Sequence, residues 1–134
     1  MKLGAARGTP GRQDRASRLH RDRDAAPKLR TMFPRVEQLR IELQFEGGGA
    51  ATPVPQVHVL HPPARAYFSF PCPYADCDGR FELTAAASAA VDDPGHPIHG
   101  VLECTGSRVS EFRSKPLCQL RLHFGLTAQC VTPH

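Results

Sequence analysis

The sequence predicts an all-β, or at least β-dominated, fold: a small antiparallel sheet of five or six short strands. Two segments alternate apolar and polar residues with a period of two, as half-buried strands do. No segment shows a convincing helical period. Turn-forming residues are frequent, with 13 prolines and 11 glycines among the 134 residues. This combination is typical of short strands joined by turns.

The first predicted strand begins near Val36, where the residue pattern changes sharply. Apolar and polar residues alternate strictly along it, and the apolar ones are Leu39, Ile41, Leu43 and Phe45. A strand of this kind is buried on one face and exposed on the other. Three glycines at residues 47–49 end the strand, and the segment up to Pro55 is predicted to be a loop.

Shorter strands are predicted in the middle of the chain. Residues 57–59 begin the second strand, which a pair of prolines then interrupts. A third strand covers residues 66–70 and leads directly into Cys72. After a glycine turn at residues 78–79, a fourth strand continues through residues 81–83.

The alanine-rich stretch at residues 85–91 is predicted to be a loop. Asp-Asp-Pro-Gly follows it directly, and so short a stretch is not stable as an isolated helix. A fifth strand is predicted from about Ile98 to Cys104. The last strand has the clearest pattern, because its apolar face consists of Cys118, Leu120, Leu122, Phe124 and Leu126.

Charge is distributed unevenly along the chain. Residues 1–31 hold nine Lys and Arg against three Asp, a net charge of +6, which leaves −2 for residues 32–134. The first segment has few large apolar side chains, so it is predicted to be a disordered basic tail. It is interpreted as a solvated tail, with a phosphate-binding arm as the alternative. Residues 32–134 are predicted to form a single domain.

The expected compartment follows from two features of the sequence. No apolar run approaches the roughly 20 residues that a membrane helix needs, and the first 30 residues lack the apolar stretch of a secretory signal. The chain is therefore expected to be cytoplasmic and not to bind membranes. In a reducing compartment, its five cysteines are metal ligands or free thiols more often than disulfides.

Four of the cysteines occupy matching places in the predicted strands. Cys72 follows one strand and Cys77 precedes the next, while Cys104 ends a strand and Cys118 begins one. The order strand–Cys–loop–Cys–strand therefore occurs twice. Two such hairpins can be joined at their tips by one Zn²⁺ ion bound to four thiolates at about 2.3 Å. Metal binding then contributes directly to folding.

The segment from residue 67 to residue 126 resembles the zinc-ribbon family. The resemblance is carried by Cys-Pro-Tyr-Ala-Asp-Cys-Asp-Gly-Arg-Phe-Glu-Leu at residues 72–83: a cysteine pair, a glycine turn, and an aromatic–x–aliphatic strand. It implies a ribbon-like pair of hairpins, a structural Zn²⁺ ion, and recognition of nucleic acid or protein. The ligand pairs that it implies are Cys72 with Cys77 and Cys104 with Cys118. Most of residues 106–115 is then an insertion within the second pair.

Other interpretations of these residues stay open. Lone cysteines are often buried simply as small hydrophobic residues, and Cys118 lies on the apolar face of its strand. Cys130 is interpreted as a free thiol, with replacement of Cys118 as the alternative. A histidine in place of Cys104 or Cys118 is a further variant. The candidate histidines are His58, His61, His96 and His99.

The favoured function is that of a structural-zinc module that binds another protein. Four thiolates leave no open coordination position, and no phosphate-binding, nucleophile-elbow or dinucleotide motif is present, so neither an enzyme nor a small-molecule substrate is expected. Protein is favoured as the partner because residues 32–134 are slightly acidic. The alternatives are a nucleic-acid-binding ribbon that uses the basic tail and the loop at 108–115, and a thiol redox sensor. The loop residues expected to bind are Arg108, Phe112, Arg113 and Lys115.

Overall fold

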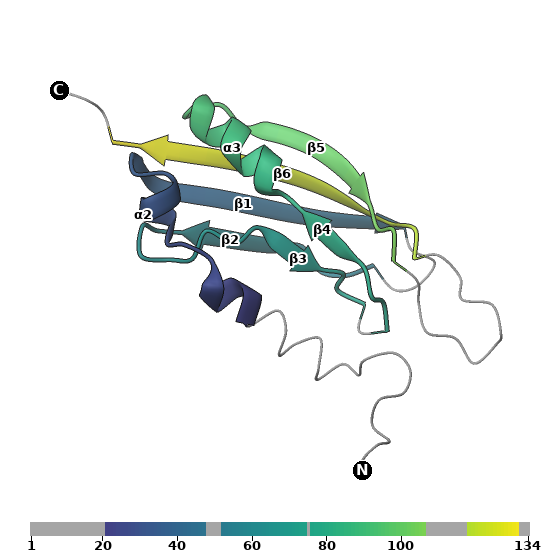
Figure 1. Cartoon of the computed structure of the whole chain (residues 1–134). Helices are drawn as coiled ribbons and strands as arrows, with labels where there is room; N and C mark the ends of the chain where they lie inside the picture. Colours follow the sequence, from purple (N-terminus) through teal and green to yellow (C-terminus); the bar gives the residue numbers. More distant parts are fainter. Residues whose placement is uncertain (1–20, 48–51, 75, 107–117, 132–134) are drawn as a thin grey trace, which may run out of the picture.

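The computed structural model describes residues 21–47, 52–74, 76–106 and 118–131. Strands dominate this part of the chain, so the prediction of an all-β fold is confirmed. Four strands form one antiparallel sheet in the order β2-β1-β6-β5, and β3 and β4 form a separate hairpin (Figure 1). The elements are α2 (Leu29–Met32), β1 (Val36–Gly47), β2 (Gln56–Leu60), β3 (Ser69–Pro71), β4 (Arg80–Glu82), α3 (Thr84–Asp92), β5 (Ile98–Glu103) and β6 (Leu120–Cys130).

The two long strands, β1 and β6, lie next to each other at the centre of the sheet. They pair antiparallel over their whole length, from Val36 opposite Cys130 to Gly47 opposite Leu120. The alternation predicted for β1 is present, with Leu39, Ile41 and the next two apolar residues buried and the residues between them mostly exposed. One face of the sheet therefore belongs to the core, and the other faces solvent.

The buried face of the sheet is covered by α3 and by the β3-β4 hairpin (Figure 1). The ring of Phe81 in β4 lies 6.4 Å from that of Phe45 in β1, measured between centroids. Phe81 and Phe68 are each 2% exposed. The hairpin and the residue before it thus add aromatic side chains that cover the apolar face of the sheet. None of the helices in the described ranges is long and apolar enough to cross a membrane.

The predicted loop at residues 85–91 is wrong, because this stretch lies in helix α3. Ala87 and Ala90 are fully buried and face the sheet at helical spacing. Packing against β6 supplies the stability that so short a helix lacks by itself. Alanine suits the position because its small side chain allows the helix backbone to approach the sheet closely.

Residues 26–31 are part of the fold, although the sequence placed them in a disordered tail. Leu29 is fully buried in the core. Its N–H donates to the carbonyl of Ala64 at 2.6 Å, and the N–H of Ala66 donates to the carbonyl of Pro27 at 2.7 Å. The folded part therefore begins before Met32. The expected disorder of residues 1–20 falls outside the described residues.

Candidate metal centre

Four cysteines meet where the ends of the two hairpins come together. Cys72 follows β3 and Cys77 precedes β4, while Cys104 follows β5 and Cys118 precedes β6. All four are buried, and their sulfur atoms lie within 4.8 Å of one another. We call these residues the cysteine cluster. Its sulfur donors are close enough together to hold one metal ion.

The spacing between the sulfur atoms fits a tetrahedral site. The Sγ atoms of Cys72 and Cys118 are 3.6 Å apart, and those of Cys77 and Cys104 are 3.5 Å apart. Four Zn–S bonds of about 2.3 Å in a regular tetrahedron place their sulfur atoms about 3.8 Å apart. A disulfide needs about 2.05 Å, and none of the four cysteines forms one.

The two halves of the cluster use the same backbone hydrogen bonds. The N–H of Gly79 points at the sulfur of Cys77 with a separation of 3.3 Å, and the N–H of Gly106 points at that of Cys104 at 3.4 Å. The Gly79 carbonyl also accepts from the N–H of Cys72 at 2.9 Å. The Gly106 carbonyl likewise accepts from the N–H of Cys118 at 3.0 Å. Donors aimed at sulfur favour its thiolate form.

Gly79 lies against Cys104 and Gly106, and Gly106 in turn lies against Gly79. A Cβ atom at Gly79 would lie 2.3 Å from the sulfur of Cys104, and one at Gly106 would lie 2.3 Å from the backbone nitrogen of Gly79. No side chain fits at either position. The sequence interpretation treated Gly79 only as a turn residue and missed Gly106. The signal that identifies both is Cys-x-Gly, which occurs at residues 77–79 and 104–106.

Burial opposes negative charge on these sulfur atoms when no cation is bound. It raises the pKa of the Cys72 thiol well above its ordinary value and that of Cys104 to about 12. The neighbouring cysteines raise both pKa values further, and the N–H groups of Tyr74 and Gly106 offset part of the rise. Four thiolates can exist together here only beside a positive charge, which a divalent metal ion provides.

Among the described residues, neither Cys130 nor any histidine belongs to the group of side chains close enough to share a metal ion with the cysteine cluster. Cys130 ends β6, whereas Cys118 precedes its start, and a strand of that length spans roughly 33 Å. His96 contacts Asp93, with 3.0 Å between Nδ1 and Oδ1. His58 contacts Gln56. The predicted binding residues of the long loop (Arg108, Phe112, Arg113 and Lys115) lie outside the described residues.

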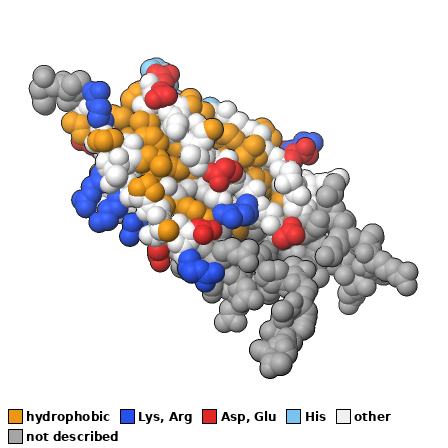
Figure 2. Space-filling view, viewed as in Figure 1, with side chains coloured by type: hydrophobic (Ala, Val, Ile, Leu, Met, Phe, Trp, Pro, Cys, Tyr) orange, Lys and Arg blue, Asp and Glu red, His pale blue; other side chains and the backbone are white. Residues whose placement is uncertain are grey.

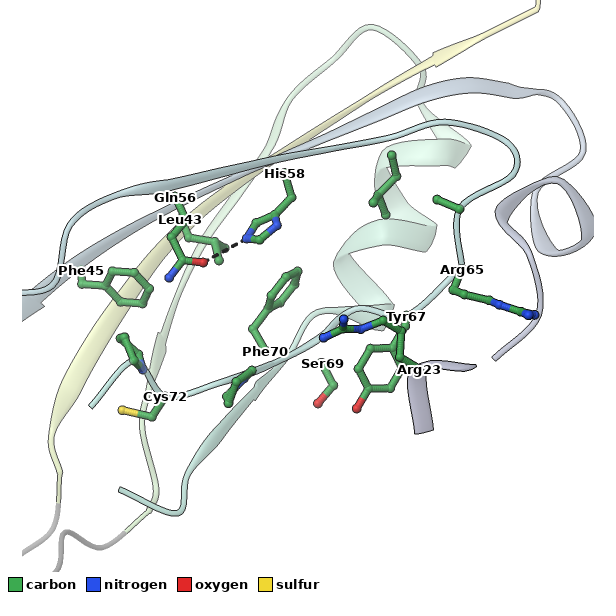
Figure 3. A pocket seen from close by; sticks show the side chains of 14 residues that line it. Arg23, Leu43, Phe45, Gln56, His58, Arg65, Tyr67, Ser69, Phe70 and Cys72 are labelled. Carbon is green, nitrogen blue, oxygen red and sulfur yellow. Dashed lines mark hydrogen bonds between the residues drawn. The ribbon is translucent and has the colours of Figure 1, made fainter. Parts of the chain in front are cut away.

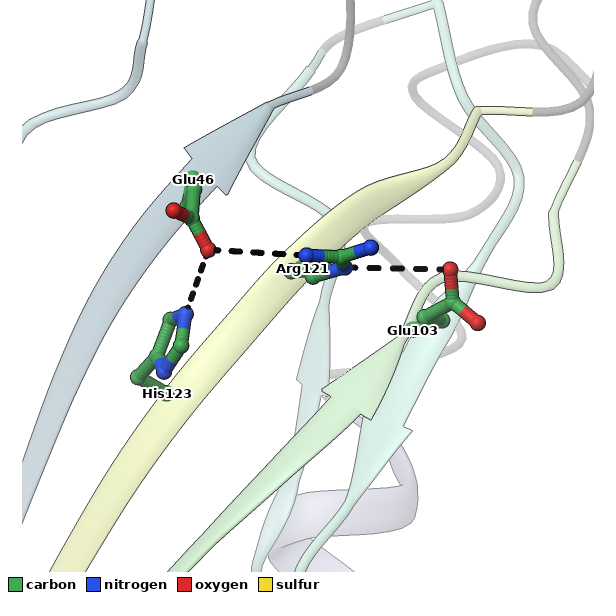
Figure 4. A network of polar contacts seen from close by, with 4 residues as sticks. All are labelled: Glu46, Glu103, Arg121 and His123. Carbon is green, nitrogen blue, oxygen red and sulfur yellow. Dashed lines mark hydrogen bonds and ion pairs between the residues drawn. The ribbon is translucent and has the colours of Figure 1, made fainter.

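A polar network lies on the solvent face of the sheet, beside the cluster (Figure 4). The Nε2 atom of His123 lies 2.7 Å from a carboxylate oxygen of Glu46. Arg121 bridges Glu46 and Glu103, at 3.9 and 4.0 Å. The hydrogen bond and charge of His123 lower the pKa of Glu46. All four side chains are largely exposed, so the network has a small effect on stability.

No family model, curated protein or solved structure matches this chain. What the cysteine cluster does must therefore be argued from its own geometry. That geometry supports a metal-binding site, because four buried sulfur donors converge from two hairpins.

Proposed function

We propose that the cysteine cluster holds one structural Zn²⁺ ion and that the domain is an interaction module of the zinc-ribbon type. The observation that carries this proposal is the convergence of four buried sulfur atoms at tetrahedral spacing. Tetrahedral sets of four thiolates hold zinc or iron. Zinc is the better fit, since closed shells of four cysteines are typical of structural zinc sites.

A structural role follows from what the ion connects. Strands β3 and β4 are three residues each, and a hairpin so short is not stable alone. The ion ties this hairpin to β5 and β6 of the larger sheet. Binding free energy is thereby added to the free energy of folding.

Catalysis is not favoured by this site. A catalytic zinc ion keeps one coordination position open for water or substrate. Four sulfur donors fill a tetrahedral shell, and the exposed fraction of each cysteine side chain is at most 6%. No free coordination position is left at such an ion.

A protein partner is supported by the solvent face of the four-stranded sheet. This outer face carries two arginines and three glutamates, so it lacks the positive charge that phosphate binding requires. The charged residues are Arg40, Glu42, Glu46, Glu103 and Arg121. The outer face of the sheet also exposes Val57 and Val59 on the edge strand β2, with 51% and 39% of their surface accessible. Exposed valines on a sheet edge suit contact with a protein. Figure 2 shows the opposite side of the molecule, which α3 and the β3-β4 hairpin cover, and acidic and basic side chains both occur there as well.

The metal is tested by native mass spectrometry of freshly purified chain, expressed with zinc, before and after addition of a chelator. One zinc per chain is expected, and its removal should unfold the protein and shift the charge states upward. Cys130→Ser is the matched control, because Cys130 lies outside the cluster, and it should keep the metal. Protein without metal, or with iron and sulfide, would refute the zinc site.

The partner is tested by isolating the tagged chain from cells with and without nuclease. A discrete protein that survives nuclease and 0.5 M salt (roughly three times physiological ionic strength) should be lost in the double variant Val57→Asp, Val59→Asp. It should remain bound to Arg30→Ala, which changes an exposed arginine of α2, outside this face. Material that nuclease or salt removes would instead favour nucleic acid, which the basic tail predicts.

The redox-sensor alternative makes a distinct prediction. A sensor cysteine must be accessible and largely ionised, whereas these four are buried. Zinc content after mild peroxide treatment should therefore stay unchanged. Release of zinc under those conditions would favour the sensor over the structural module.

A further inference from the structure

A cavity of about 560 Å³ lies between strand β2 and the segment at residues 64–73 (Figure 3). Pockets that bind small molecules have volumes of roughly 300–1,000 Å³. The sequence alone did not indicate this cavity, because the residues that line it are distant from one another in the sequence. Cys72 touches one end of the cavity, but its walls are otherwise separate from the cysteine cluster.

The middle of the cavity is apolar. Leu43 and Phe45 of β1 and Phe70 of β3 line it. The ring of His58 lies 5.0 Å from that of Phe70, and its Nε2 atom is hydrogen-bonded to Gln56 at 2.9 Å. Burial lowers the pKa of His58, so the ring is neutral at pH 7 and adds to the apolar wall.

The other end of the cavity is cationic. Arg23 and Arg65 line it, together with the hydroxyl-bearing Tyr67 and Ser69. The Arg65 guanidinium donates to the carbonyl of Ala26 at 2.9 Å and points away from Phe70, so Arg23 is the arginine directed into the cavity (Figure 3). Arg80 donates to the hydroxyl groups of Tyr67 and Ser69, which brings a third guanidinium close by. None of the described lining residues is acidic. In Figure 3 the guanidinium of Arg23 extends toward Phe70, and its charge contributes to the lowered pKa of His58.

We propose that this cavity binds a small amphipathic anion, with its carboxylate at Arg23 and its apolar body against Phe45 and Phe70. The charge pattern selects this class of ligand. An apolar body gains from leaving water, and a carboxylate beside the Arg23 guanidinium forms charge-assisted hydrogen bonds. A neutral ligand leaves this guanidinium without a charge partner, and a cation is repelled. Ligand binding here is independent of which metal the cysteine cluster holds.

The test uses decanoate as the probe, titrated into the full-length, metal-loaded chain by calorimetry. We expect one decanoate per chain. Arg23→Ala should weaken binding about tenfold or more, since hydrogen bonds to charged groups contribute about 1.5–3 kcal/mol. Arg40→Ala is the control, because Arg40 is an exposed arginine on the outer face. It should bind decanoate as the unmodified chain does.

Two further measurements decide the class of ligand. Gln56→Trp fills the cavity and should abolish binding, while the metal content and melting temperature show that the variant is folded. Decanol, which has the same chain without the carboxylate, should bind at least tenfold more weakly. Equal binding of decanol, or of decanoate to Arg23→Ala, would overturn the proposal. Binding of an acidic hexapeptide but not of decanoate would overturn it as well, in favour of a protein segment.

Discussion

Two residues without side chains determine the detail of the metal centre. Gly79 and Gly106 each direct an N–H group at a sulfur atom, and each leaves room that a Cβ atom would fill. The positions of the four cysteines could be predicted from the strand pattern around them. The part played by Gly106 could not, because it depends on the contact between two hairpins that are distant in sequence.

Replacing one of these glycines should damage the site more than replacing its neighbour. Gly106→Ala places a methyl group against the backbone of Gly79, so zinc affinity should fall about 10- to 100-fold. Stability should fall by about 1–3 kcal/mol because of overpacking. Competition with a chromophoric chelator measures the affinity. Thr105→Ala changes the exposed residue next to Gly106 and should bind zinc normally; equal losses in both variants would contradict this explanation.

The pKa of Glu46 should depend mainly on His123, with a smaller contribution from Arg121. His123 is the largest cause of the lowered pKa of Glu46. In His123→Ala, the pKa of Glu46 should therefore rise toward 4.5, as followed by an NMR titration of the carboxyl carbon. Because the pKa is lowered in the folded state, Glu46 favours folding above its ordinary pKa, and this contribution is lost as the pH falls through the folded value. His99→Ala, on the neighbouring strand β5, should leave the titration unchanged.

At the scale of elements, the strands were easier to predict than the helices. The period of two in β1 and β6 reflects burial on one face, so the sequence contains it directly. Helix α3 lacks an equivalent signal, since almost all of its residues are small and weakly apolar. Its stability comes from contact with β6. The residues of α3 alone do not reveal this contact with β6, which is distant in sequence.

The face of α3 that meets the sheet should be sensitive to volume. Ala87 is fully buried, so Ala87→Leu overpacks the contact with the sheet and should cost about 1–3 kcal/mol. Ala85→Leu adds the same side chain to an exposed position of the same helix and should be nearly neutral. Urea unfolding followed by circular dichroism gives both values. A neutral Ala87→Leu would mean that α3 does not pack against the sheet.

At the scale of the whole molecule, the two sheets meet at two places with different chemistry. The cysteine cluster joins the ends of the hairpins, and the cavity lined by Arg23 and Phe70 lies between β2 and the segment at 64–73. The cluster was predictable because cysteines at strand ends are visible in the sequence. The cavity was not, because Arg23 and Phe70 become neighbours only when the order of the strands is known.

Zinc should stabilise the molecule as a whole and by a defined amount. If one ion binds only the folded chain, the free energy of unfolding rises by about 1.4 kcal/mol for each tenfold increase in free zinc above the dissociation constant. Urea unfolding in zinc buffers measures this slope. Cys130→Ser should have the same slope. A slope of zero would rule out a structural ion, and a doubled slope would require a second site.

The pairing of β1 with β6 has a consequence for how the protein is made. Val36 lies opposite Cys130, so the central strand finds its longest neighbour almost a hundred residues later. During synthesis, β1 cannot pair with β6 until β6 has left the ribosome. Until then β1 has only the short strand β2 beside it. The nascent chain therefore exposes one edge and the apolar face of a long hydrophobic strand, a state in which chaperones protect such segments from aggregation.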